Sequence, residues 1–264
     1  MREQTLAPAA RLSAPSPALW DRSLLHALGR RARPLYRQCF RPSTIRLDGV
    51  VLQIDYDAWS PQMISWLLSE QYELTERKTI RKFLEPNDRV LEVGGAIGLI
   101  SMLAARIVGE DRVFVYEANP EILAAANQNY TLNGLALRGR HAAVVADNFS
   151  GDTVDFFVQE NFWSSSLLSR GPATNRIEAP AVKLGALLQR HGPTALIMDV
   201  EGAELDILAA SNLDGLRKLC VEVHTRYLGL ERANELLSKL RDRGLLLDLE
   251  LSREECLCFR RCAG

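Results

Sequence analysis

The stretch "VLEVGGAIGLIS" (residues 90–101) joins two apolar runs through a turn that holds Gly94, Gly95 and Gly98. The first run has the length and composition of a buried strand, and the second fits the first turns of a helix. In a doubly wound sheet, ligands dock at such strand-to-helix turns, beyond the carboxyl ends of the strands. The GxGxxG pattern of a pyrophosphate cradle is broken, because Ala96 stands at the place of the middle glycine. The turn therefore fits a nicotinamide or flavin cofactor poorly.

The next strand-like run, "RVFVYE" (112–117), ends in a carboxylate that suits a ribose. Glu117 follows Gly98 by about 20 residues, the separation at which an acid accepts hydrogen bonds from a ribose diol. The ligand should contain a ribose without needing a phosphate cradle, and S-adenosylmethionine meets both demands. Its methionine end would approach the glycine turn, where Glu92 lies within reach of the ammonium group. The predicted cofactor contacts are Glu92, Gly94, Gly95, Gly98, Glu117, Ala118, Ala143 and Val144.

Short apolar runs alternate with helical segments through most of the chain. The runs cover residues 89–93, 112–117, 141–146, 195–200 and 219–224. Nearly continuous apolar strands between helices predict an α/β fold with a doubly wound parallel sheet covered on both faces. The expected helices cover about 98–109, 202–211 and 230–243, and Asn119-Pro120 opens a further one. The last two runs, 245–251 and 255–261, predict an antiparallel hairpin at the end of the sheet.

The N-terminal part has a different composition. Residues 1–43 hold eight arginines against two acids and are rich in Ala, Pro and Ser, so we expect a basic, disordered or partly helical extension. A transit peptide, a basic arm for an anionic partner and an amphipathic segment at a membrane surface are alternatives. Residues 44–88 should form a hairpin about Asp48-Gly49 and a lid helix from Ile64 to Phe83. Residues 89–264 should form the ligand-binding domain.

Composition limits the class of protein. The chain has 264 residues, 47% of them hydrophobic and 25% charged, which is ordinary for a globular α/β protein. No apolar run approaches the roughly 20 residues of a membrane span, and the N-terminus lacks the apolar core of a secretory signal, so we expect a cytoplasmic protein. A formal net charge of -1 gives no global attraction to nucleic acid. The five cysteines form no repeated CxxC and are expected to be free thiols.

Six motifs, in this order, resemble the FkbM family of S-adenosylmethionine-dependent methyltransferases: "VLEVGGAIG", "VYEANP", "NYTLNG", "SSSL", "IMDVEGAELDIL" and "VEVH". The resemblance covers about residues 70–225. It implies a Rossmann-like class I methyltransferase sheet of seven strands with an antiparallel last hairpin. It also implies O-methylation of hydroxyls on sugars, glycans or polyketide-like molecules. The chain departs from the common family pattern in two places. At the turn, Glu92 and Gly95-Ala96 replace the residues that are common in the family, and Ile197 stands where a lysine is common.

Ionisable side chains gather at the ends of the fourth and fifth apolar runs. Asp199 ends the fourth run, Glu201 and Glu204 open the following helix on one face, and Glu222 and His224 alternate on the fifth. Methyl transfer to an oxygen needs a proton acceptor, and Asp199, Glu201 or His224 is predicted for that role. Glu204 and Glu222 should position the substrate or each other. The alternatives are a helix start for Glu204, a structural strand-end histidine, and a divalent-metal site, which the spacing does not favour, so no metal is predicted.

Three further segments carry candidates. Tyr72 and Glu73 match a Tyr-Glu pair that the family commonly places before the first strand, as part of a lid or of an ordinary amphipathic helix. Trp163 and Ser165, in "QENFWSSSLLS" (159–169), are predicted to line the substrate rim or anchor the loop. Cys256 and Cys258 alternate on a predicted strand and are interpreted as strand residues rather than as a zinc site.

Three functions from different classes fit these patterns. The first is an S-adenosylmethionine-dependent O-methyltransferase with a small-molecule or glycan acceptor and no nucleic-acid partner. The second is a protein that binds S-adenosylmethionine without catalysis, which tight binding without turnover would reveal. The third is a nucleotide-dependent oxidoreductase, against which the missing GxGxxG argues. The oligomeric state stays open.

Overall fold

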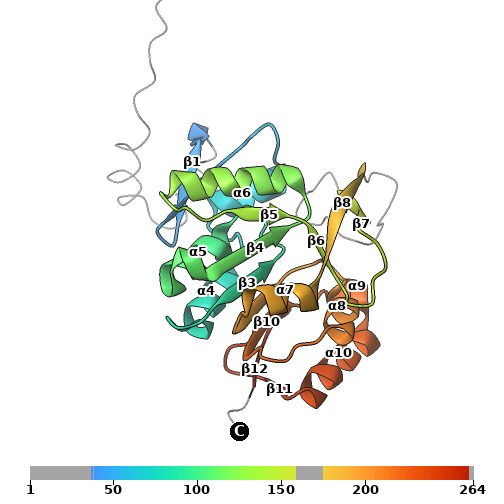
Figure 1. Ribbon diagram of the computed structural model, residues 1–264. Helices are drawn as coiled ribbons and strands as arrows, with labels where there is room; N and C mark the ends of the chain where they lie inside the picture. Colours follow the sequence, from blue (N-terminus) through green and yellow to red (C-terminus); the bar gives the residue numbers. More distant parts are fainter. Residues whose placement is uncertain (1–36, 38, 159–174, 262–264) are drawn as a thin grey trace, which may run out of the picture. The chain divides into compact units, whose positions relative to one another are not determined.

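The computed structural model describes residues 37, 39–158 and 175–261 (Figure 1). The chain divides into two units, Met1–Pro42 and Ser43–Gly264. The second unit contains the α/β domain. Within the described part of the chain, no helix combines the length and the hydropathy that a bilayer-spanning segment requires.

The second unit is built on a seven-stranded sheet with the strand order β11-β12-β10-β9-β3-β4-β5. Its strands are β3 (Val90–Val93), β4 (Val113–Glu117), β5 (Gly139–His141), β9 (Ala195–Met198), β10 (Lys218–Glu222), β11 (Leu245–Leu247) and β12 (Cys256–Arg261). The neighbours from β10 to β5 pair in parallel, whereas β12 pairs antiparallel with both β10 and β11. The predicted doubly wound sheet with an antiparallel last hairpin is confirmed.

Helices cover both faces of the sheet because its strands are apolar on both sides. Alternate residues of one strand enter different cores: Val90 belongs to one buried cluster and Leu91 to the other. The first cluster contains residues of α4 (Leu74–Phe83), α5 (Leu99–Val108) and α6 (Pro120–Leu132). The second contains residues of α7 (Leu184–His191), α8 (Glu204–Ala210) and α10 (Leu230–Asp242), on the other side of the sheet (Figure 1).

The predicted N-terminal hairpin is present as β1 (Thr44–Leu47) and β2 (Val50–Gln53). Asp48 and Gly49 both have positive φ angles, 50° and 87°, as a tight two-residue turn requires. Asn129 on α6 and Asn133, the residue that follows the helix, complete the free edge of β2: Asn133 Oδ1 accepts from the Val51 N–H and Asn129 Oδ1 from the Gln53 N–H, each at 2.9 Å. These amides fix the hairpin against the domain.

The single lid helix predicted over Ile64–Phe83 is wrong. The structure has two helices, α3 (Pro61–Leu68) and α4, with left-handed backbone at Glu70 (φ 64°) and Glu73 (φ 46°) between them. The buried Arg77 guanidinium stabilises this break, since it donates to the carbonyls of Glu70 and Tyr72 at 2.9 and 3.1 Å. The break is what carries Tyr72 and Glu73 toward the carboxyl ends of the strands.

Two other predicted runs divide differently. The single strand predicted over 141–146 is split between two sheets. His141 is the last residue of β5 in the main sheet, and Ala143–Val145 form β6 of a separate three-stranded sheet. The other strands of that sheet are β7 (Thr153–Val158) and β8 (Asn175–Lys183), of which β8 was not predicted. The run 245–251 is a strand only to Leu247, because the Asp248 carboxylate then accepts the N–H groups of Glu250 and Leu251 and turns the chain. Neither α7 nor the short α9 (Thr225–Leu228) was predicted.

Candidate functional site

A cavity of about 360 Å³ opens at the carboxyl ends of β3, β4, β9 and β10. This is the edge of the sheet at which ligands of doubly wound proteins bind. Among the predicted site residues, those that line the cavity are Tyr72, Glu73, Gly94, Glu117, Ala118, Ala143, Val144, Asp199, Glu201, Glu222 and His224. Glu92, Gly95, Gly98 and Glu204 lie outside this lining. Trp163 and Ser165 lie outside the described residues.

The glycine turn is tight for packing reasons as well as for access. Gly94 has a φ of 84°, and a Cβ at this position would lie 1.8 Å from the carbonyl oxygen of Asp199. A Cβ at Gly95 would lie 2.3 Å from Val115, and one at Gly98 would lie 2.5 Å from the Tyr130 ring. Gly94 therefore brings the turn against the end of β9, while Gly95 and Gly98 allow close packing inside the domain.

Glu117 is held at the end of β4 by backbone donors. Its two carboxylate oxygens accept the N–H of Asn119 at 2.8 Å and the N–H of Ala96 at 3.1 Å. The second bond ties the acid to the glycine turn, so the two parts of the predicted cofactor site are joined directly. Burial raises the pKa of Glu117 to about 7, although these N–H groups act in the opposite direction.

Glu92 lies one layer behind the cavity, on β3. It is 3% exposed and hydrogen-bonds to Ser101, and its Oε2 atom has no hydrogen-bond partner among the described residues. Burial raises the pKa of Glu92 to about 8. The structure thus places this acid behind the lining residues, and its approach to the methionine ammonium group stays a prediction.

Tyr72 and Glu73 line the cavity from the break between α3 and α4. Their side chains hydrogen-bond to each other, and burial raises the pKa of both groups well above the usual values. Glu92 and Glu222 add negative charge near Glu73 and act in the same direction. This corner of the cavity is suited to an ammonium group, because a cation would compensate several crowded carboxylates.

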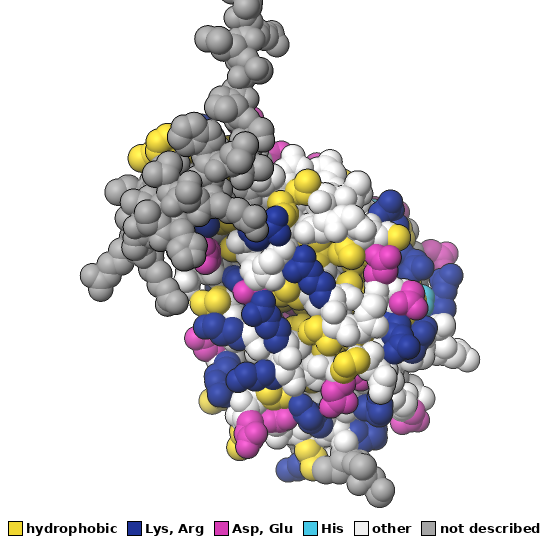
Figure 2. Space-filling view, turned by 90° about the vertical axis from the view of Figure 1, so that its left-hand side faces the viewer, with side chains coloured by type: hydrophobic (Ala, Val, Ile, Leu, Met, Phe, Trp, Pro, Cys, Tyr) yellow, Lys and Arg dark blue, Asp and Glu magenta, His cyan; other side chains and the backbone are white. Residues whose placement is uncertain are grey.

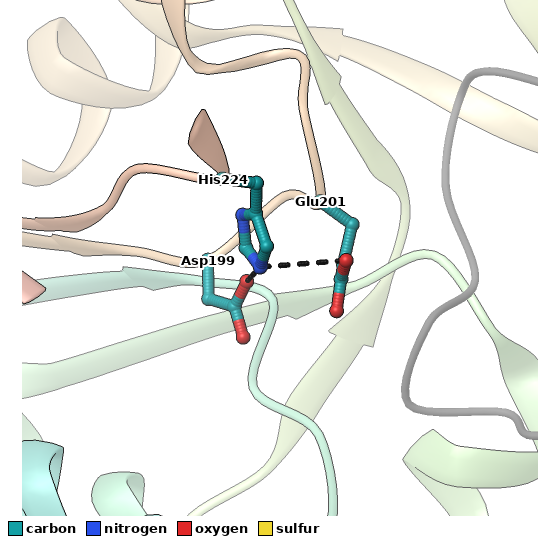
Figure 3. Close-up of side chains that lie close together, drawn as sticks. All are labelled: Asp199, Glu201 and His224. Carbon is teal, nitrogen blue, oxygen red and sulfur yellow. Dashed lines mark ion pairs between the residues drawn. The ribbon is translucent and has the colours of Figure 1, made fainter. Parts of the chain in front are cut away.

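The His224 ring lies close to the carboxylates of Asp199 and Glu201, and all three residues line the cavity (Figure 3). Its Nδ1 atom lies 2.7 Å from Glu204 Oε1, and its Nε2 atom lies 3.3 Å from Glu201 Oε2 and 3.7 Å from Asp199 Oδ1. Glu204 is fully buried and also accepts the Gly202 N–H at 2.8 Å. The fixed carboxylate holds one ring nitrogen and directs the other toward the cavity.

The charges around His224 determine the direction in which its pKa is shifted. Burial lowers the pKa of His224, but the hydrogen bond to Glu204 and the nearby charges of Glu201 and Glu222 outweigh it, so the pKa is raised. Burial and the charge of Glu222 also raise the pKa of Asp199. The ring and the acids are therefore electrostatically linked.

The expected helical arrangement of Glu201 and Glu204 is wrong. Glu201 has a φ of 53° and Gly202 a φ of 103°, so both precede the helix, which begins at Glu204. These two left-handed residues reverse the chain and bring the acids to different nitrogens of one imidazole. His224 also lies two residues beyond Glu222, the last residue of β10, yet its Nε2 atom comes within 3.8 Å of Glu222 Oε1.

Oxygen and nitrogen atoms at this end of the cavity lie close enough together to hold one metal ion. One ligand atom each from Asp199, Glu201 and His224 lies within 4.8 Å of the other two. Carboxylate and imidazole donors suit divalent ions such as Mn²⁺, Fe²⁺ or Zn²⁺. The prediction that no metal takes part stays a prediction.

The cavity is strongly acidic. Its carboxylates belong to Glu73, Glu76, Glu117, Asp199, Glu201, Glu222 and Glu255. Arg226 is the one Lys or Arg that lines it among the described residues. Burial raises the pKa values of Glu76 and Glu222 to about 7 each. Sequence reasoning missed Glu76, Arg226 and Glu255, because no motif marks a helix or loop residue that only the tertiary fold brings to the cavity.

Together, the doubly wound sheet, the glycine turn tied to Glu117 and the cavity beyond the strand ends define a protein of the Rossmann-like class I methyltransferase type. The model of the methyltransferase FkbM domain matches residues 92–247. The chain belongs to the FkbM family of methyltransferases. The family resemblance predicted from the sequence is confirmed.

Solved structures give weaker similarities, and no curated protein matches the chain. A ribosomal protein L11 methylase from Lactobacillus delbrueckii subsp. bulgaricus is 14% identical, with a TM-score of 0.42, and the match covers 74% of this chain and 80% of that one. TYW2 of M. jannaschii, in complex with AdoMet, is 14% identical with a TM-score of 0.43, over 83% of this chain and 86% of that one. TYW2 of P. horikoshii, in complex with MeSAdo, is 11% identical with a TM-score of 0.44, over 90% and 83%.

Proposed function

We propose that the protein transfers a methyl group from S-adenosylmethionine to a hydroxyl of an uncharged, hydroxyl-rich acceptor such as a sugar, a glycan or a polyketide-like molecule. Family membership supports methyl transfer. The observation that carries the O-methylation proposal is the His224 ring, which a fully buried Glu204 holds at Nδ1 while Nε2 faces the cavity. Such a pair is suited to take a proton from an oxygen.

The cofactor would lie along the strand ends. Glu117 would accept hydrogen bonds from the ribose hydroxyls, and the main chain of Ala118, Ala143 and Val144 would surround the adenine. Gly94 leaves room beside the turn for the methionine part. Glu73 would compensate the ammonium group, and a cation bound there would favour ionisation of the buried Glu92 behind it. Gly95 and Gly98 then act as packing residues that support the turn.

The reaction is an in-line displacement. The acceptor oxygen forms a bond to the methyl carbon while the carbon–sulfur bond breaks, and the electron pair stays on the sulfur of S-adenosylhomocysteine. The acceptor proton must leave, and His224 Nε2 is our candidate to take it. Asp199 and Glu201 would then stabilise the protonated ring, and Glu222 would position the acceptor.

The charge of the cavity selects against anionic acceptors. Seven carboxylates face Arg226 and His224, so a phosphate would meet net repulsion at the transfer point. On the face shown in Figure 2, Lys and Arg side chains are interspersed with Asp and Glu rather than gathered into one basic area. The charge of the cavity supports a small-molecule or glycan acceptor over a nucleic acid. The cytoplasmic location stays a prediction.

A transfer assay with matched variants tests the role of the His224 and Glu204 pair. Formation of S-adenosylhomocysteine is measured with a panel of sugars, glycans and polyketide-like alcohols, and with amines and RNA as competitors. Glu204→Gln should lower kcat about 100-fold, because a neutral amide no longer stabilises the protonated ring, while the affinity for S-adenosylmethionine stays unchanged. Asp206→Asn, in an exposed acid of the same helix, should have no effect. Full activity of Glu204→Gln would refute this role.

The second candidate for the group that activates the acceptor hydroxyl, besides His224, is a divalent cation. The close approach of Asp199, Glu201 and His224 favours it. These residues would hold the ion, which would lower the pKa of a bound hydroxyl. Loss of transfer in a chelator, restored by one added divalent ion, would favour the cation, and activity that resists chelation would favour the imidazole alone. Tight binding of S-adenosylmethionine with no turnover of any acceptor would instead favour a non-catalytic binding protein.

A further inference from the structure

Trp66 is the exposed aromatic residue of the cavity wall. It lies on α3, is 37% exposed and lines the cavity, so it borders both the cavity and the solvent. The other Trp, Tyr and Phe residues of the described lining, Tyr72, Tyr116 and Phe156, are 7% exposed or less. Folding buries most large aromatic side chains, so one that stays exposed beside a cavity indicates a surface that a ligand covers.

The backbone of α3 fixes Trp66 in this position. The Trp66 carbonyl accepts the N–H groups of Gln71 and Tyr72 at 2.8 and 3.2 Å, and the Ser69 hydroxyl donates to it at 3.2 Å. These bonds tie the end of α3 to the break that carries Tyr72 into the lining. The indole is therefore presented from an ordered backbone, which lowers the entropy cost of holding a ligand against it.

Arg226 borders the cavity from α9, next to the proposed proton acceptor. Its guanidinium lies over the Tyr227 ring, with Cζ 4.4 Å from the ring centroid, and the centroids of the Tyr227 and His224 rings are 6.0 Å apart. Glu255 anchors the start of α9, because its Oε1 atom accepts the Thr225 hydroxyl at 2.7 Å. Arg226 is exposed, and its N–H groups have no hydrogen-bond or ion-pair partner within the described part of the chain. They can donate to a ligand in the cavity.

Trp66 and Arg226 match the two kinds of surface on a pyranose ring. One face of such a ring carries C–H groups that pack on an indole, and the hydroxyls at its edge accept from a guanidinium and donate to carboxylates. Glu222 and Glu255 supply carboxylates in the same lining. An apolar, polyketide-like chain would instead remove these charged groups from water without giving them partners, which costs binding free energy. The lining therefore favours a ring sugar.

We propose that Trp66 and Arg226 form the recognition site for a neutral pyranose, which is the acceptor of the methyl group. Trp66 would stack on the C–H face of the ring. Arg226 would donate to a hydroxyl that neighbours the reacting one, and would so orient the reacting oxygen toward His224. The inference rests on the proposed function and narrows its acceptor to a ring sugar.

Binding of matched alcohols tests the recognition site. The probes are methyl glycosides of the neutral hexopyranoses, deoxyhexopyranoses and pentopyranoses, added to the full-length protein with excess S-adenosylhomocysteine. Each is compared with its alditol, which has the hydroxyls without a ring face, and with cyclohexanol, which has a ring without a neighbouring hydroxyl. Ligand-observed NMR gives the dissociation constants. At least one pyranoside should bind about 10-fold more tightly than both comparison alcohols.

Each substitution should remove one of the two preferences. Trp66→Ala should weaken the pyranoside about 10-fold, to the level of its alditol, and raise KM with little change in kcat, whereas Trp66→Phe should keep the preference for the ring. Arg226→Lys loses the planar fork of N–H donors and should bring the pyranoside to the level of cyclohexanol. Binding of S-adenosylmethionine should stay unchanged in all three. Leu132→Ala and Arg241→Lys, at exposed positions outside the lining, are the controls.

The opposite results separate this inference from the proposed function. Absence of any preference for pyranosides over their alditols across the panel would overturn the recognition site, even where another alcohol is methylated. A preference for the ring that persists in Trp66→Ala, or one over cyclohexanol that persists in Arg226→Lys, would overturn it as well. Pyranoside preferences that the two substitutions remove, without methyl transfer to any member of the panel, would support the site and contradict the proposed function.

Discussion

At the scale of single residues, the proposed role of Glu117 links its protonation to cofactor binding. A ribose diol donates hydrogen bonds, so the binding form of this acid is the carboxylate. With a pKa of about 7 in the free protein, the ionised fraction falls as the pH drops below 7. The raised pKa follows from burial, which disfavours the charge until a ligand supplies donors.

The affinity for S-adenosylmethionine should therefore depend on pH. Between pH 8 and pH 5.5, the dissociation constant should rise by up to about tenfold per pH unit once the pH is below 7. Glu117→Gln should bind weakly with little pH dependence, since it has no charge to lose. Calorimetric titrations at four pH values measure both proteins. An affinity of the unaltered protein that stays constant over this range would show that Glu117 does not titrate there.

Glu92 makes a second residue-scale prediction, on stability. Its pKa is about 8 in the folded protein against an ordinary 4.5, so the folded state holds a proton that the unfolded chain has lost between these values. The free energy of unfolding must then fall as the pH rises from 4.5 to 8. From pH 6 to pH 8.5 this group alone lowers the free energy of unfolding by about 2.5 kcal/mol.

Glu92→Gln should remove that part of the pH dependence. Urea unfolding at pH 6 and pH 8.5 compares the two proteins, and the variant should lose about 2.5 kcal/mol less than the unaltered chain. Glu231→Gln, in an exposed acid on α10, is the matched control. Parallel pH profiles of Glu92→Gln and the unaltered protein would show that Glu92 is ionised, and compensated, in the folded state.

At the scale of elements, local patterns predict the parts of the fold that local interactions determine. The Asp48-Gly49 hairpin and the Asn119-Pro120 helix start carry their turn and capping residues in the sequence, and both are present. The break between α3 and α4 was not predicted, because an apolar pattern that continues through Tyr72 gives no sign that Arg77 will bond the carbonyls of the break. The split of 141–146 depends on pairing with β8, which is distant in sequence.

The turn between β3 and α5 is the element on which the proposed cofactor site depends most. Gly94→Ala adds a methyl group 1.8 Å from the Asp199 carbonyl in a left-handed conformation, so it should destabilise the protein by about 3 kcal/mol or more and abolish cofactor binding. Gly134→Ala is the control: its φ of 70° is also left-handed, but nothing lies within 4 Å of the added atom, and it should cost about 1–2 kcal/mol. Equal effects in thermal melts would mean that the close approach to β9 does not matter.

At the scale of the whole molecule, the candidate site follows from topology. Parallel strands end at one edge, so the acids predicted at the ends of separate runs, Glu117, Asp199 and Glu222, meet in one cavity although they are far apart in sequence. The contribution of Glu76, Arg226 and Glu255 could not be predicted, since it depends on where α4, the short α9 and the loop before β12 pack. The position of the cavity at the sheet edge was thus accessible from sequence, and the acidity of the cavity was not.

The central claim is that S-adenosylmethionine binds in this cavity with its ribose on Glu117. Calorimetric titration of the full-length protein with S-adenosylmethionine and S-adenosylhomocysteine tests it most directly, with Glu117→Ala and the exposed-site control Glu231→Ala. We predict saturable binding at one site, weakened about 100-fold in Glu117→Ala through the loss of two hydrogen bonds to a charged group, and unchanged in the control. Failure of the folded, unaltered protein to bind either ligand, or equal binding by Glu117→Ala, would contradict the account.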